Sequence, residues 1–126
     1  MIPGKAEMTE HYHSPDDRRF VRDLRQAAPD EYAAYTAFGA AAVGRADGAI
    51  PPKYRELIAL GVALTTRCSY CLDTHTAAAA KLGATAAEIA ELTYIAAALN
   101  AGAAAAHGML AMKLYKNAVE ALDAGT

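Results

Sequence analysis

The sequence predicts an all-α fold of about six helices in a single domain, residues 1–126. Alanine has the highest intrinsic helix propensity, and it accounts for 33 of the 126 residues. Apolar residues recur at helical spacing between breaks that contain proline or glycine, and no segment alternates apolar and polar residues as a β-strand does. The chain is 54% hydrophobic and 21% charged, which is typical of one folded globular domain.

The N-terminal half is expected to hold three helices after a loose segment of residues 1–14. Asp16 and Asp17 follow Ser14, and carboxylates in a first helical turn interact favourably with the helix dipole. Asp30, directly after Pro29, is the expected N-cap of the second helix. The expected helices of this half run over about residues 14–28, 30–43 and 53–66.

The C-terminal half is expected to hold three more helices. Gly83 is a suitable C-cap, and Thr85 and Glu88 have the spacing of a capping box at the next helix start. A break at 100–102 (Asn-Ala-Gly) is expected to separate the last two helices. The expected helices of this half run over about residues 68–82, 86–99 and 103–122.

Charge and hydropathy exclude several classes of partner. The net charge is −2 and the pI is about 6.0, so the chain has no basic surface for nucleic acid or an anionic membrane. The N-terminal residues lack the apolar stretch of a secretory signal. Asn100 and His107 interrupt the alanine-rich stretch 95–112, which is therefore expected to fall short of a membrane span. We expect a cytoplasmic protein without nucleic-acid or membrane partners.

The two cysteines form a C-x-x-C pair that is followed by a histidine. Cys68, Cys71 and His75 stand at positions i, i+3 and i+7, which share one face of a helix. Cys68 is expected at the helix N-terminus, where the dipole favours a thiolate. Cytosolic proteins rarely hold structural disulfides, so the pair is interpreted as a reactive dithiol with His75 as its proton acceptor.

Glu56 is the second unusual feature. The residues at i+3, i+4 and i+7 from it are Ala59, Leu60 and Ala63, so its face of the helix is apolar. A carboxylate buried there would be disfavoured in its charged form and suited to proton transfer. A solvated surface charge is the alternative interpretation.

Two other interpretations of the cysteines remain open at this point. Zinc needs four ligands, which Cys68, Cys71 and His75 could supply together with Glu56 or His107, but a second C-x-x-C or H-x-x-H motif is missing. The cysteines could also be inert. Either case would make the protein a metal-binding or purely structural oligomer.

The spacing of these residues resembles a known family. Glu56, eleven residues, Cys68-x-x-Cys71, three residues and His75 are similar to the signature of AhpD-like alkylhydroperoxidases in the carboxymuconolactone decarboxylase superfamily. The resemblance covers a helical core over about residues 51–117. It implies an all-α fold, a homo-oligomer (trimer or hexamer) and reduction of peroxides without a cofactor or metal. The decarboxylase branch lacks the cysteine pair, so its lactone chemistry is not implied.

The resemblance also implies roles for individual residues. Cys71 would attack the peroxide, Cys68 would resolve it as a disulfide, and Glu56 and His75 would relay protons. Tyr70 stands where well-known members carry a second histidine, and it is a much weaker base at neutral pH. Tyr70 and His107 are possible neighbours of the site, although an apolar helix face makes a packing role the first interpretation of His107.

The sequence therefore predicts a peroxidase that acts through a redox-active cysteine pair on organic or hydrogen peroxide. An unknown thiol reductant would restore the dithiol. The alternative function is thiol–disulfide exchange or redox sensing by the same pair, without significant peroxidase turnover.

Overall fold

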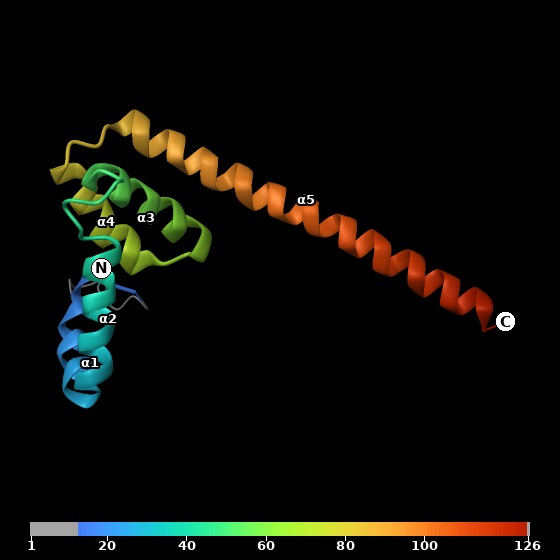
Figure 1. The fold of residues 1–126 in the computed structure, drawn as a ribbon, viewed down its shortest axis with the longest axis horizontal. Helices are drawn as coiled ribbons and strands as arrows, with labels where there is room; N and C mark the ends of the chain where they lie inside the picture. Colours follow the sequence, from blue (N-terminus) through green and yellow to red (C-terminus); the bar gives the residue numbers. More distant parts are fainter. Residues whose placement is uncertain (1–12, 126) are drawn as a thin grey trace, which may run out of the picture.

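The computed structural model describes residues 13–125, and every regular element within that range is a helix. In Figure 1, α3 and α4 lie beside the start of α5, while the rest of α5 extends away from the other helices. The elements in chain order are η1 (Pro15–Phe20), α1 (Val21–Ala27), α2 (Pro29–Ala42), α3 (Pro52–Thr66), α4 (Ser69–Lys81) and α5 (Ala86–Ala124). This confirms the all-α class. The segment predicted to be loose lies outside the described residues, apart from residues 13 and 14.

The core forms where α3 packs against both α4 and α5. Its buried residues are Leu60 and Ala63 on α3, Ala79 on α4 and Ala96 on α5. Three of these four are alanines, whose side chains remove little apolar area from water. A single chain therefore has a small core, centred on Leu60.

The N-terminal elements differ in two details from the prediction. The first expected helix is divided into a 3₁₀ helix, η1, and a short α-helix, α1. A capping box holds the start of η1, since the Ser14 amide donates to the Asp17 carboxylate at 3.0 Å. Asp30 is not an N-cap, because α2 begins one residue earlier at Pro29, with Ala28 in the cap position. Proline suits the first helical position, where its missing N–H would have no partner.

The connection between α4 and α5 agrees with the prediction. Gly83 has a φ of +84°, and the Ala84 amide donates to the Ala79 carbonyl at 3.0 Å, which closes the end of α4. The expected capping box follows at once. The Glu88 amide donates to the Thr85 hydroxyl at 3.1 Å, and the Thr85 amide donates to the Glu88 carboxylate at 2.9 Å.

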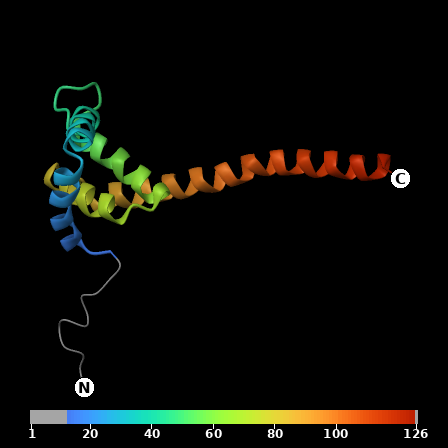
Figure 2. The ribbon, with the colours of Figure 1, turned by 90° about the horizontal axis from the view of Figure 1, so that it is seen from below.

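The predicted break at 100–102 is wrong, because α5 is one continuous helix of 39 residues, about 58 Å long. Asn100 and Gly102 each cost the helix no more than about 1 kcal/mol relative to alanine, and their neighbours are mostly alanines. Every residue from Ala97 to Gly125 is exposed. Figure 2 shows this C-terminal part as a straight arm with no other described segment beside it.

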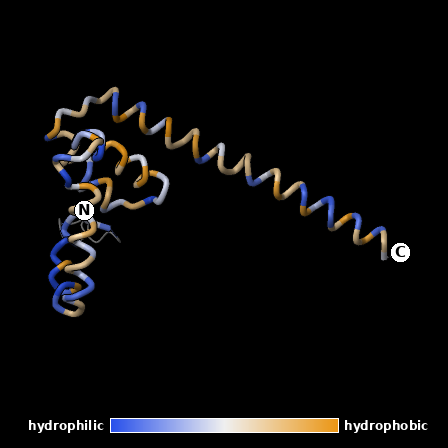
Figure 3. Tube along the Cα trace, viewed as in Figure 1, coloured by the Kyte–Doolittle hydropathy of each residue, from blue (hydrophilic) through white to orange (hydrophobic). Residues whose placement is uncertain are grey.

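The continuity of α5 also changes how its hydropathy is interpreted. By length and composition, α5 is able to cross a membrane, whereas the sequence predicted that the stretch 95–112 falls short of a span. Almost none of its most apolar window is buried within the chain. Figure 3 shows hydrophobic positions recurring along the whole arm, with hydrophilic positions more frequent toward its C-terminal end.

An ion pair joins the starts of α3 and α5. The Lys53 ammonium lies 2.9 Å from the Glu88 carboxylate, and both side chains are about a quarter exposed. The hydrogen bond between them raises the pKa of Lys53 and lowers the pKa of Glu88. Glu88 also belongs to the capping box with Thr85. The same carboxylate therefore caps the N-terminus of α5 and pairs α5 with α3.

We predict that Leu60→Ala lowers the free energy of unfolding by about 2–5 kcal/mol, since it leaves a cavity in a core that has no other large buried side chain among residues 13–125. Chemical denaturation followed by circular dichroism measures this change. Met109→Ala removes a side chain that is 73% exposed and serves as the control, with an expected change within about 0.5 kcal/mol. Equal effects of the two substitutions would show that Leu60 is not the centre of the core.

Candidate active site

The cysteine pair lies at the turn between α3 and α4. α3 ends at Thr66, and its C-cap residue, Arg67, has a φ of +57° and a ψ of +46°, which place it in the left-handed region. The next residue, Cys68, is the N-cap of α4, and its sulfur accepts a hydrogen bond from the Cys71 amide at 3.2 Å. Both cysteines therefore occupy the first turn of α4, as the sequence predicted.

The two sulfurs form a disulfide. Cys68 and Cys71 have Cα atoms 5.2 Å apart, which is within the usual range for a disulfide. The structure thus corresponds to the oxidised form of the pair. In this form both sulfurs are bonded to each other, so neither can act as the thiolate ligand that a zinc site requires.

Glu56 and His75 are brought together across the α3–α4 interface. The Glu56 carboxylate oxygen Oε2 lies 2.6 Å from His75 Nδ1, which is a short hydrogen bond between a carboxylate and an imidazole. The Glu56 side chain is only 12% exposed and that of His75 is 23% exposed. The structure therefore contradicts the interpretation of Glu56 as a solvated surface charge. A carboxylate on Nδ1 fixes the orientation of the ring and leaves Nε2 for another partner.

A cavity of about 360 Å³ opens beside this pair. Cys71 and His75 both line it, whereas Cys68 and Glu56 do not. Its other lining residues are mostly apolar: Ala42, Val43, Ile50, Arg55, Ile58, Ala59, Val62, Ala63 and Thr66. A small molecule in this cavity would meet Cys71 and His75 and would be separated from Glu56 by the imidazole.

Arg55 shapes one wall of the cavity, a role that sequence reasoning missed. Its guanidinium donates to the carbonyl of Ala42 at 2.7 Å and to that of Ile50 at 2.8 Å, which joins the end of α2 to the loop before α3. A Cβ at Gly48 would lie 1.9 Å from Arg55 Nη2, so a larger residue there would displace the guanidinium from this position. The sequence around Arg55 does not predict these contacts. Both acceptors are backbone carbonyls, which every residue has, so no residue type marks them.

The Tyr70 side chain contacts η1 and does not contact Glu56 or His75. Its hydroxyl donates to the Asp17 carboxylate of η1 at 2.7 Å, and Arg18 of η1 pairs with Asp73 and donates to Thr74 at 2.9 Å. These contacts hold η1 against α4. Tyr70 therefore anchors the N-terminal elements at the cysteine motif, and it takes no part in the Glu56–His75 contact.

His107 is not a neighbour of the site within one chain. It lies on the C-terminal part of α5, which extends away from α3 and α4 (Figure 1), and it is exposed. It does not line the cavity beside Cys71. The sequence makes His107 only a possible neighbour of the site, with packing on an apolar helix face as the first interpretation, and within one chain that face is exposed.

A profile of the carboxymuconolactone decarboxylase family matches residues 29–114, so the chain belongs to this family. The match includes Glu56, both cysteines and His75. The resemblance stated from the motif is thus confirmed at the level of the family.

Relatives in other organisms share part of the chain. A Paracoccus denitrificans protein named "Uncharacterized protein 4 in cox locus" is 42% identical over 67 residues, which is 53% of this chain and 60% of that protein. An uncharacterized protein of Haemophilus influenzae is 42% identical over 64 residues, which is 50% of this chain and 54% of that protein. The matches therefore span between half and two thirds of each relative.

A solved structure supports the fold. The apo crystal structure of a carboxymuconolactone decarboxylase family protein from Legionella pneumophila superposes with a TM-score of 0.61 at 28% sequence identity. The superposition covers 67% of this chain and 73% of the other. The helical arrangement described here is thus one that the family adopts.

We predict a pH-dependent effect of Tyr70→Phe. The Tyr70 hydroxyl and the Ser14 amide lower the pKa of Asp17 from its ordinary value of 3.8, so the ionised carboxylate stabilises the folded state above about pH 4. This stabilisation is lost as the pH falls through the lowered value. Tyr70→Phe should lower the unfolding temperature at pH 7, and the difference from wild type should shrink below pH 4. A difference that is constant from pH 7 to pH 3 would contradict the assignment.

Proposed function

We propose that the protein reduces hydroperoxides with its cysteine pair and without a bound cofactor or metal. The observation that carries the proposal is that Cys71 and His75 line one apolar cavity while a carboxylate, Glu56, holds the histidine from behind. Family membership supports it, since the resemblance to AhpD-like members rests on these same residues. The apolar lining favours an organic hydroperoxide over hydrogen peroxide.

The reaction begins with Cys71 as a thiolate. His75, positioned by Glu56, accepts the proton of the thiol. The thiolate then attacks the terminal oxygen of the hydroperoxide, the O–O bond breaks, and the alkoxide leaves. The protonated His75 returns the proton to the alkoxide, so that an alcohol is released and Cys71 becomes a sulfenic acid.

Cys68 completes the oxidative half of the cycle. Its sulfur attacks the sulfenic sulfur of Cys71, water leaves, and the disulfide seen in the structure forms. The two thiols have then supplied the two electrons that the peroxide accepted. A thiol reductant must return two electrons and two protons before the next turnover, which fits a protein of the reducing cytoplasm.

The assignment of Cys71 as the attacking residue rests on the cavity. Only the second cysteine faces the space that a peroxide would occupy, while Cys68 lies at the helix N-cap. Cys68 remains the resolving partner because its sulfur already accepts from the Cys71 amide in the same helical turn.

We predict different products from the two single-cysteine variants. One equivalent of cumene hydroperoxide should convert reduced wild type to an intramolecular disulfide, a loss of two hydrogens by mass spectrometry. Cys68→Ser should stop at a sulfenic acid on Cys71 that dimedone traps, because attack occurs but resolution does not. Cys71→Ser should consume the peroxide at least about a hundredfold more slowly than wild type.

Two outcomes would contradict the proposal. Two persistent free thiols in wild type after peroxide treatment would remove any redox role of the pair. Reduced protein that transfers electrons to a disulfide such as oxidised glutathione, but leaves the hydroperoxide unconsumed, would show thiol–disulfide exchange instead.

A further inference from the structure

A single permanent positive charge lines the cavity beside Cys71 and His75. It is the guanidinium of Arg55, and within the described residues no acidic side chain lines the cavity. The adjacent carboxylate, Glu56, is bonded to His75 instead. No carboxylate among residues 13–125 pairs with Arg55, so its charge is not neutralised by this part of the chain.

The Arg55 guanidinium is held in place and still has donors to offer. Its Nε donates to the Ile50 carbonyl at 2.8 Å, and its Nη1 donates to the Ala42 carbonyl at 2.7 Å. These bonds use two of the five N–H groups that a guanidinium carries. Backbone carbonyls have no net charge, so they orient Arg55 and leave its positive charge available to an anion.

Arg55 and Cys71 lie toward opposite ends of the cavity. The lining residues on α3 recur at helical spacing, from Arg55 through Ile58 and Val62 to Thr66. This stretch of helix is about 16 Å long. Cys71 belongs to the first turn of α4, which follows the C-terminal end of α3 after a short turn. An apolar ligand with an anionic head can therefore place the head at Arg55 and its other end at Cys71.

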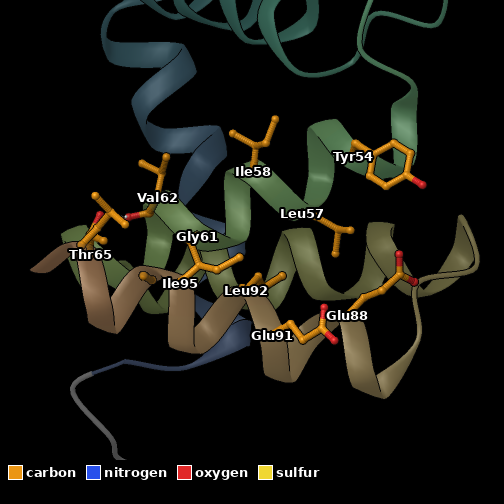
Figure 4. A pocket seen from close by; sticks show the side chains of 12 residues that line it. Tyr54, Leu57, Ile58, Gly61, Val62, Thr65, Glu88, Glu91, Leu92 and Ile95 are labelled. Carbon is orange, nitrogen blue, oxygen red and sulfur yellow. Dashed lines mark hydrogen bonds between the residues drawn. The ribbon is translucent and has the colours of Figure 1, made fainter.

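The other hollow along α3 has the opposite charge. Figure 4 shows the groove between α3 and α5, with Glu88 and Glu91 among the side chains that line it. Lys53 pairs with Glu88, which leaves the carboxylate of Glu91 as the net charge of this lining. The groove is the larger of the two, about 610 Å³ against 360 Å³, but its charge repels an anion, whereas the charge of Arg55 attracts one.

We propose that Arg55 selects organic hydroperoxides that carry a carboxylate, by binding the carboxylate while the hydroperoxide group meets Cys71. A guanidinium binds a carboxylate through charge-assisted hydrogen bonds, and the apolar walls accept the hydrocarbon between the two ends. The proposal rests on the proposed function for the reacting end of the substrate. The carboxylate takes no part in the bond changes, so the product is the corresponding hydroxy carboxylate.

Equilibrium binding tests the anion site without any turnover. The probes are para-isopropylbenzoate and its neutral isostere para-isopropylbenzamide, titrated calorimetrically into the oxidised full-length chain at about pH 7.5. Wild type should bind the benzoate about ten- to a hundredfold more tightly than the benzamide. Arg55→Gln should abolish this preference, and Arg55→Lys should retain part of it. The matched control, Arg45→Gln, removes a charge that does not line the cavity and should keep the full preference.

Turnover tests the same preference with a matched pair of substrates, cumene hydroperoxide and its para-carboxylate. Wild type should prefer the carboxylate, mainly through a lower KM, and Arg55→Gln should lower the ratio of the two kcat/KM values at least about tenfold. Because Arg55 also joins α2 to the loop before α3, its substitution also slows turnover of the neutral substrate. A purely structural role would change both kcat/KM values equally and leave their ratio unchanged.

Two binding results would overturn the proposal: equal affinity of wild type for the two isosteres, or an equal loss of both affinities in Arg55→Gln. Consumption of both hydroperoxides at the same kcat/KM would also overturn it and would leave the peroxidase function standing. Arg55-dependent binding of the benzoate by a protein that consumes neither hydroperoxide would support the anion site and remove the peroxidase function.

Discussion

The hydrogen bond between Glu56 and His75 is the contact on which the rest of the structure depends. It joins α3 to α4 at 2.6 Å beside a core in which Leu60 is the single large buried side chain of the described part of the chain. The left-handed turn at Arg67 makes this contact possible, because it reverses the chain within two residues and sets the two helices side by side. The same turn places both cysteines in the first turn of α4, so packing and chemistry share one local geometry.

The remainder of the molecule is arranged around that pair of helices. η1 is tied to α4 through Asp17 and Tyr70, and Arg55 ties the end of α2 to the loop that borders the cavity. α5 begins at the capping box of Thr85 and is held against α3 by Lys53 and Glu88. These polar contacts join the elements around a core built largely from alanine, which buries little apolar area in one chain.

The sequence predicted the features of the structure that depend on residues close to one another in the chain. The helix class, the glycine end of α4, the capping box at Thr85 and the place of the cysteine pair at the start of α4 follow from propensity and spacing within a few residues. The continuity of α5 could not be predicted, because Asn100 and Gly102 are weak breakers whose effect depends on neighbouring helix length. The partner of Tyr70 and the acceptors of Arg55 are distant in sequence and left no local signal.

In the proposed mechanism, Glu56 acts through His75 on Cys71. Glu56→Gln keeps the shape and hydrogen bonding of the side chain but removes its ability to exchange a proton. The most direct test is the single-turnover rate with an organic hydroperoxide, with thiolate absorbance near 240 nm followed against pH in the Cys68→Ser background. The account predicts a rate about a hundredfold lower and a higher pH for half-ionisation of Cys71, with no change in the control Glu31→Gln. An unchanged rate and an unchanged ionisation midpoint in Glu56→Gln would contradict it.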